Sequence, residues 1–230
     1  MVLTTCRNSN SRRLMEKTYI SFIKFGDKTF MEKLFYDGEI HCNTLNHFSD
    51  EEYKDLRTDK YDGADYLIQA KDLKFKHEGK LLANAEFGQV YSRNINLIGN
   101  IFCLYGIENE VLELTSTFKK IKLNLDEINW GDTAVFIFNT QEFLKRMKTA
   151  IEIEGFKYNI SPITYYEEKT FEGNLTPFHK RKELYETQKE VRYWIPNNVN
   201  QIKKFYIGNM SDISFIIPKN EIKKLKYDYK

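Results

Sequence analysis

The chain has 230 residues, of which 41% are hydrophobic and 30% are charged, a composition typical of globular rather than disordered or membrane-embedded proteins. Its net charge is +2, from 35 basic and 33 acidic residues, which is too small an excess to favour a protein built around a nucleic-acid backbone. Aromatic residues make up 15% of the chain, and we expect most of them in a packed core because each buries a large apolar area.

The three cysteines, Cys6, Cys42 and Cys103, are widely separated and include no Cys-x-x-Cys pair. An odd, sparse set argues against a disulfide framework and for a reducing compartment. The first 16 residues contain no apolar run of signal-peptide length, and Ile213–Pro218 is too short to cross a bilayer. We therefore expect a cytoplasmic protein without a membrane partner.

The opening of the chain predicts a strand, a helix and a second strand. Tyr19–Phe25 is a nearly continuous apolar run, as in a buried strand, and Gly26 ends it. Asp27 is a suitable N-cap for a helix whose apolar residues recur at helical spacing, and Gly38 is placed as its C-terminal glycine. Glu39–Asn43 predicts the second strand.

The middle of the chain, residues 66 to 91, predicts β-structure. Leu73 and Phe75 alternate with lysines, and the segment His77–Lys80 has the composition of a hairpin turn. The apolar run Ile101–Tyr105 predicts a further strand.

A helix is predicted in the third quarter of the chain, after a buried strand at Ala134–Phe138. Asn139 and Glu142 have the spacing of a capping box, in which side chain and backbone satisfy each other at a helix start. Apolar residues then form a stripe at helical spacing, and Gly155 ends the helix.

The last part of the chain predicts four strands followed by a short basic tail from Pro218. The predicted strands are Ile160–Tyr166, Glu190–Ile195, Lys203–Ile207 and Ile213–Ile217. Strands and helices are mixed without regular βαβ alternation, so we expect an α+β fold with a mostly antiparallel, twisted sheet flanked by helices. Residues 1–17 are expected to form a flexible segment, and residues 18–230 a single domain.

Common catalytic motifs are missing from the sequence. His41, Cys42 and His47 lie close together, but neighbours on a strand point to opposite faces, so His41 and Cys42 cannot easily share one ion, and we expect no metal site. There is no Gly-x-Ser-x-Gly, no P-loop and no Gly-x-Gly-x-x-Gly. Basic clusters at 119–122 and 179–182 are either phosphate contacts or solvated surface.

The chain is similar in outline to a set of uncharacterised bacterial proteins, some of which are found with phage-defence systems. Their pattern opens with an aromatic–glycine strand, continues through a helix that ends in glycine, and finishes with an aromatic residue before a Glu–Arg strand. The matching segments here are Ile23–Gly26, Gly38, Asn43–Glu51, the strand–helix–strand at 134–166 and Tyr185–Arg192.

The opening also resembles ADP-ribosyltransferases, which break the nicotinamide–ribose bond of NAD. This resemblance implies that Glu190 is the catalytic carboxylate, because a carboxylate stabilises the oxocarbenium-like cation. It places Lys24, Phe25 and Gly26 on the strand that recognises nicotinamide, although the family has Arg or His where this chain has Lys24. Tyr91 is the nearest counterpart of the family's middle-strand motif.

Two candidate site residues, Glu190 and Arg57, each have an alternative interpretation. Glu190 and Arg192 are two apart on a predicted strand and therefore share a face, so they could instead form a structural salt bridge. Arg57 could clamp a pyrophosphate through bidentate hydrogen bonds, or belong to a charged turn.

The resemblance implies a toxin-like effector that uses NAD as a substrate and transfers ADP-ribose to a nucleic acid or a protein. Such a toxin would need a neutralising antitoxin partner. Two other classes stay open: a non-enzymatic module that binds protein or RNA, and a metal-dependent nuclease using Asp59, Asp62 and Asp65.

Overall fold

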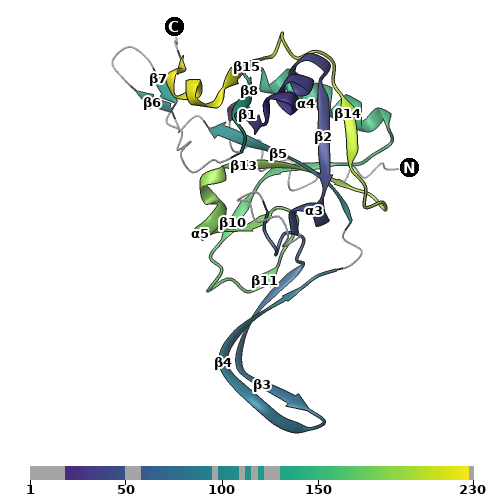
Figure 1. Cartoon of the computed structure of the whole chain (residues 1–230), viewed down its shortest axis with the longest axis vertical. Helices are drawn as coiled ribbons and strands as arrows, with labels where there is room; N and C mark the ends of the chain where they lie inside the picture. Colours follow the sequence, from purple (N-terminus) through teal and green to yellow (C-terminus); the bar gives the residue numbers. More distant parts are fainter. Residues whose placement is uncertain are drawn as a thin grey trace, which may run out of the picture.

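The computed structural model describes residues 19–49, 58–94, 98–108, 112–114, 119–121 and 130–227. The segment 1–17, which was expected to be flexible, lies outside these residues. A large sheet and its helices form the body of the molecule, and one long hairpin extends away from it (Figure 1). Within the described residues, no helix has both the length and the apolar character needed to cross a bilayer.

Eight strands of the described chain form the main sheet, in which every pairing is antiparallel. The order is β14-β2-β5-β1-β8-β15, and β13 pairs with both β5 and β9. This confirms the α+β class with a mostly antiparallel sheet. The strands are β1 (Tyr19–Gly26), β2 (Glu39–Thr44), β5 (Gly99–Glu108), β8 (Thr133–Ile137), β9 (Asn159–Pro162), β13 (Glu190–Pro196), β14 (Lys203–Tyr206) and β15 (Ser214–Pro218).

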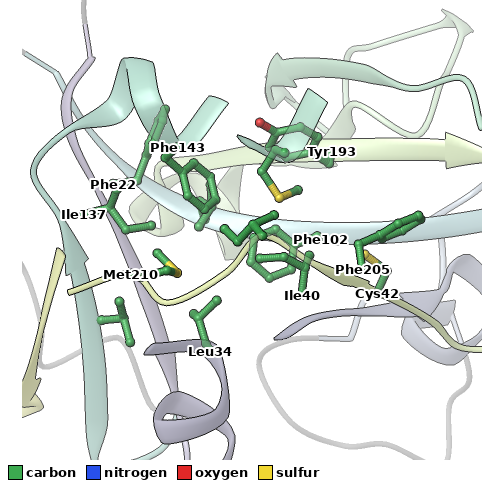
Figure 2. Packing of buried hydrophobic residues seen from close by; sticks show 14 of the residues in the cluster. Phe22, Leu34, Ile40, Cys42, Phe102, Ile137, Phe143, Tyr193, Phe205 and Met210 are labelled. Carbon is green, nitrogen blue, oxygen red and sulfur yellow. The ribbon is translucent and has the colours of Figure 1, made fainter. Parts of the chain in front are cut away.

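Helix α4 (Thr140–Ile153) packs its apolar stripe into the main core, as its sequence predicts. Asn139 caps the helix by accepting a hydrogen bond from the Glu142 backbone N–H at 3.1 Å. Phe143 from this helix packs against Phe22, in a cluster of buried side chains that also includes Tyr193 from the sheet (Figure 2). The predicted Asn139 cap and core face are therefore confirmed, but the capping box is only half formed, because the Asn139 backbone N–H donates to the Ile213 carbonyl oxygen and the Glu142 carboxylate bonds Lys145 and Arg146 instead.

The predicted opening helix is present but changes geometry along its length. It begins as α2 (Lys28–Glu32) and continues as a π-helical turn, η1 (Lys33–Asp37), before Gly38 adopts the left-handed conformation at φ 66°. A side chain at Gly38 would collide with the backbone of Gly208, which explains the glycine. The predicted cap is wrong in one detail, because Asp27 accepts the first helical bonds with its backbone oxygen and its side chain makes none.

The long hairpin consists of β3 (Tyr66–His77) and β4 (Lys80–Ser92). We call it the arm. Its turn residues Glu78 and Gly79 have φ values of 47° and 79°, the left-handed pair that a two-residue hairpin turn requires, so the predicted hairpin is confirmed. The arm leaves the body at its base, where the short strand β11 (Gly173–Asn174) pairs with β3 (Figure 1).

Two sequence expectations near the C-terminal half are wrong. The predicted strand Ile160–Tyr166 is two strands in different sheets, because the backbone of Ile163 turns to donate to Glu190 while β10 pairs with β12. The stretch after Pro218 is not a plain tail but contains a 3-10 helix and a short strand. The remaining elements are α3 (Leu45–Ser49), β6 (Leu112–Leu114), β7 (Lys119–Ile121), β10 (Thr164–Tyr166), β12 (His179–Arg181), α5 (Lys182–Tyr185), η4 (Glu186–Gln188), η5 (Lys219–Lys224) and β16 (Lys226–Tyr227).

Candidate functional site

A pocket of about 280 Å³ opens where the main sheet divides. One edge of β5 pairs with β2 at Asn100 and Ile101, and with β1 only from Tyr105 onward. In the described chain, neither strand covers the stretch 102–104 between these two pairings, whereas β13 follows β5 along its opposite edge. The cavity therefore lies between β1 and β2, with the middle of β5 as its back wall.

Three of the predicted cofactor residues line this pocket: Lys24, Phe25 and Gly26. Lys24 crosses the gap between the strands, where its Nζ donates to the Cys103 carbonyl oxygen at 2.8 Å and lies 4.5 Å from the ring centroid of Phe102. Lys24 thus satisfies a carbonyl that a neighbouring strand would otherwise pair. Its ammonium group is consequently fixed in the wall of the pocket.

Aromatic rings form most of the apolar wall. The Phe25 ring is T-shaped against Trp130, with centroids 6.4 Å apart, and against Tyr105, with centroids 6.2 Å apart. Six pocket-lining residues are aromatic: Phe25, Phe30, Phe48, Phe102, Tyr105 and Trp130. Rings in these orientations suit a flat apolar ligand, which gains from edge-to-face and offset contacts.

Glu190 lies at the polar end of the same pocket, although it is distant from Lys24 in sequence. Its side chain is buried, with one carboxylate oxygen 2.6 Å from Arg192 Nε and the other 2.9 Å from Lys180 Nζ. Its backbone N–H donates to the Tyr165 hydroxyl at 2.9 Å. The Glu190 carboxylate is therefore held by a cation at each oxygen, and the backbone of the same residue is held by a hydrogen bond.

Arg192 is fully buried and joins Glu190 to Asp62. Its two Nη atoms lie 2.7 and 3.0 Å from the two oxygens of Asp62, and Nη1 also donates to the Pro177 carbonyl at 2.6 Å. The salt bridge that was the alternative interpretation of Glu190 and Arg192 is therefore present. Glu190 also lines the cavity, so the same residue belongs to the salt-bridged cluster and to the pocket wall.

The charge state of this cluster follows from burial and pairing. Burial raises the pKa of the Glu190 carboxyl, but the charges of Arg192 and Lys180 outweigh it and hold that pKa well below its usual range. Burial lowers the pKa of Lys180, but the negative charge of Glu190 outweighs this effect, and the pKa of Lys180 is raised. At neutral pH, the pocket therefore contains an ionised carboxylate beside a protonated lysine.

Lys180 is a site residue that the sequence did not single out. The basic stretch 179–182 was interpreted as phosphate contacts or solvated surface, but β12 alternates, so Lys180 points inward to Glu190 and to Gln188, whose Oε1 is 3.1 Å from Nζ. Its neighbour Arg181 points elsewhere and pairs with Asp59 at 2.9 Å. Strand periodicity over 179–181 was the one available signal.

Two other predicted cofactor residues do not contribute to the described pocket. Tyr91 stacks on Tyr61, with ring centroids 3.6 Å apart, and bonds Glu168 at the base of the arm, so it does not line the pocket with the other predicted residues, and its role in binding NAD stays a prediction. It lies there because β4 carries it away from the main sheet. Arg57 lies outside the described residues, and the next described residue, Thr58, lines the pocket.

The candidate metal ligands are engaged in other contacts. His41 Nε2 lies 3.1 Å from Asn43 Oδ1, and Cys42 is packed in the main core. Asp59 and Asp62, proposed for a nuclease, each pair with a different arginine instead of facing one ion position. Among the residues that the structure describes, no three His, Cys, Asp or Glu side chains are placed to hold a metal.

The pocket thus combines an aromatic wall with an ionised carboxylate that two cations hold in place. Such a site can bind a planar ring and stabilise positive charge that develops next to it. The pocket cysteine, Cys103, is a poor nucleophile, because its pKa is raised to about 12, chiefly by burial. Neither a protein-family model, nor a curated protein, nor a solved structure matches this chain.

Proposed function

We propose that this chain is a bacterial toxin-like effector of the ADP-ribosyltransferase type, which splits NAD in the pocket and transfers ADP-ribose to a nucleic acid or a protein. The observation that carries the proposal is that Glu190 lines the same cavity as Lys24, Phe25 and Gly26. The resemblance had assigned these residues to the catalytic carboxylate and to the nicotinamide strand. Their meeting in one pocket did not follow from their distant positions in the sequence.

In the proposed reaction, the bond between the ribose and the nicotinamide nitrogen breaks, and its electron pair neutralises the ring nitrogen. The ribose is left as an oxocarbenium-like cation, which the acceptor attacks as it loses a proton. Glu190 is already ionised at neutral pH because its pKa is lowered, so its negative charge is available to stabilise this cation. A carboxylate has about four acceptor positions, and Glu190 accepts from Arg192, Lys180 and Cys103, which leaves one for a ribose hydroxyl.

The size and walls of the cavity match the nicotinamide end of NAD. A volume of about 280 Å³ is at the lower limit of ordinary ligand pockets, so the adenylate half would extend beyond it. The rings of Phe25, Trp130 and Tyr105 provide the surface against which nicotinamide would pack. The role of Arg57 as a pyrophosphate clamp stays a prediction.

The test is NAD cleavage by the purified chain and by its Glu190→Gln variant. We expect the wild type to release nicotinamide and to arrest growth when expressed in bacteria, and Glu190→Gln to do neither. The matched control is Asp59→Asn, which also neutralises a buried, ion-paired carboxylate but lies away from the pocket lining. Labelling of protein or nucleic acid with ADP-ribose would identify the acceptor, and release of nicotinamide by Glu190→Gln at the wild-type rate would overturn the proposal.

A second candidate function is supported by the arm. Seven large apolar side chains of the arm are exposed to solvent. They are Tyr66, Ile68, Phe75, Leu81, Leu82, Phe87 and Val90. Such a surface is typical of a protein-binding site. If growth arrest survives Glu190→Gln but is lost when the arm is shortened, the chain acts as a binding module and not as a transferase.

The cytoplasmic location and the antitoxin belong to the same proposal. NAD and the expected acceptors are cytoplasmic, and an active NAD-splitting enzyme would harm its own cell unless a partner neutralised it. Co-expression with neighbouring genes should therefore restore growth in the transferase case.

A further inference from the structure

The buried Asp62 has no part in the chemistry proposed above, yet it is built into the site. It is 1% exposed, and both of its oxygens bond Arg192, which in turn bonds Glu190. We infer that Asp62 is a positioning residue, which orients Arg192 so that the Glu190 carboxylate and the Lys180 ammonium face the pocket. This inference rests on the proposed function for its catalytic consequence, but not for its geometry.

The backbone around Asp62 forms a tight turn that fixes its side chain. The Asp62 backbone N–H donates to the Asp59 carbonyl oxygen at 2.7 Å, and Gly63 follows with φ 81°. A side chain at Gly63 would meet Leu45, and its φ is one that other residues rarely adopt. Asp62 therefore reaches Arg192 from a hydrogen-bonded turn outside the main sheet.

Asp62 completes the set of charged groups around Lys180. Five titratable groups act on or contact Lys180: Glu190 and Arg192 from β13, Cys103 from β5, Tyr185 from α5, and Asp62 from its turn. Two cations, Lys180 and Arg192, thus face two carboxylates, Glu190 and Asp62. Without the Asp62 carboxylate, as in Asp62→Asn, the two buried cations share one carboxylate. Arg192 then has no second anion to hold its guanidinium away from the pocket.

This imbalance has two measurable consequences. Lys180 loses one of the charges that raise its pKa, so its proton is lost at a lower pH than in the wild type. Glu190 is drawn toward Arg192, which displaces the carboxylate from the position it needs beside the ribose. A displacement of this kind lowers kcat by about 10- to 100-fold while the apolar wall, and so KM, changes little.

Asp59 supplies a matched control for Asp62. It is 2% exposed, lies in the same segment and pairs with an arginine at 2.9 Å. That arginine, Arg181, contacts the rings of Tyr61 and Tyr185 and does not reach Glu190. Asp59→Asn therefore removes one carboxylate partner from a largely buried arginine, which keeps Glu168, without removing any of the charges that act on Lys180.

The experiment compares wild type, Asp62→Asn, Asp59→Asn and Asp62→Glu by the pH dependence of NAD cleavage and by NMR titration of the Lys180 ammonium. Asp62→Asn should lower kcat, leave KM within about twofold and move both the alkaline limb of the rate and the Lys180 titration to lower pH. Asp59→Asn should move neither. Asp62→Glu restores the charge with a longer side chain, so it should return the Lys180 titration to the wild-type pH and only part of kcat.

The two proposals fail in different ways. If the wild type does not cleave NAD, the proposed function is wrong, and the Lys180 titration still tests the role of Asp62. If Lys180 titrates alike in Asp62→Asn and Asp59→Asn, Asp62 is only a structural residue and the inference is overturned. If Asp62→Asn does not fold, the Asp62→Glu comparison decides: wild-type kcat in that variant would overturn a positioning role.

Discussion

Strand β13 of the main sheet and the arm are both antiparallel β-structure, but they bury their side chains to very different extents. One face of β13 is apolar and the other carries Glu190 and Arg192; both faces are buried, and Arg192 has no exposed surface. On the arm, β3 and β4 leave large apolar residues in solvent on a ribbon whose only strand neighbour in the described chain is β11, at the base. The two regions are thus alike in their antiparallel strand pairing, but only in the main sheet are the side chains packed away from solvent.

The difference shows where the folding free energy is concentrated. A two-stranded ribbon is marginal in water because neither of its faces is covered, whereas the main sheet gains from a core on one side and an ionic cluster on the other. We therefore expect the body to determine stability and the arm to contribute little to it. Four measurements test this contrast, and they are given in order of decreasing expected effect.

The largest effect is expected from removing the buried guanidinium. Arg192→Met leaves Asp62 and Glu190 buried with Lys180 as their remaining cation, and should cost about 3–5 kcal/mol of unfolding free energy. The measurement is urea unfolding, with Arg146→Met as the surface control, because Arg146 pairs with exposed carboxylates and should cost about 1 kcal/mol or less. Equal losses in the two variants would contradict the importance of the buried cluster.

A matched pair of phenylalanines compares the core with the arm directly. Phe143 is 0% exposed and Phe75 is 54% exposed. Phe143→Ala should cost about 3–5 kcal/mol because it leaves a cavity in the core, and Phe75→Ala should stay within about 0.5 kcal/mol. If Phe75→Ala destabilises the chain by as much as Phe143→Ala, the arm is packed in solution, against a partner or a second copy.

The pH dependence of stability tests the ionised state of Glu190. Because its pKa is lowered in the folded chain, Glu190 contributes stability above its unfolded pKa of about 4.3 and loses that contribution as pH falls further. The thermal midpoint of the wild type should therefore fall steeply below about pH 5, and the Glu190→Gln variant should show a shallower slope there. Identical slopes would mean that Glu190 is not held ionised by Arg192 and Lys180.

The smallest effect is expected from shortening the arm. Ala70 and Gly88 are paired across the two strands, so Lys71–Phe87 can be replaced by an Asn-Gly turn without disturbing the base. We expect an almost unchanged thermal midpoint and unchanged nicotinamide release, since the arm does not line the pocket. Loss of nicotinamide release on shortening would show that the arm contributes to the active site.

Local sequence determined the elements whose signals are short-range. The Asn139 cap, the apolar run of β1 and the turn at Glu78 and Gly79 all formed as predicted, because a cap, a buried strand and a left-handed turn depend on residues a few positions apart. The π-helical turn at Lys33–Asp37 and the interruption of the predicted strand at Ile163 were not predicted, because both involve contacts with residues distant in the sequence.

For the site, the sequence by itself placed Glu190, Lys24, Phe25 and Gly26 on two strands, and only the tertiary structure brought those strands to one cavity. Lys180 and Asp62 read as surface charge and as a polar turn, because a single sequence does not show which ionic side chains are buried. Tyr91 was predicted to bind the cofactor, but it lies at the base of the arm, where it stacks on Tyr61 and does not line the pocket. Spacing along the chain constrains nearby residues, whereas a pocket is set by sheet pairing between distant ones, and that pairing is decided when the whole core packs.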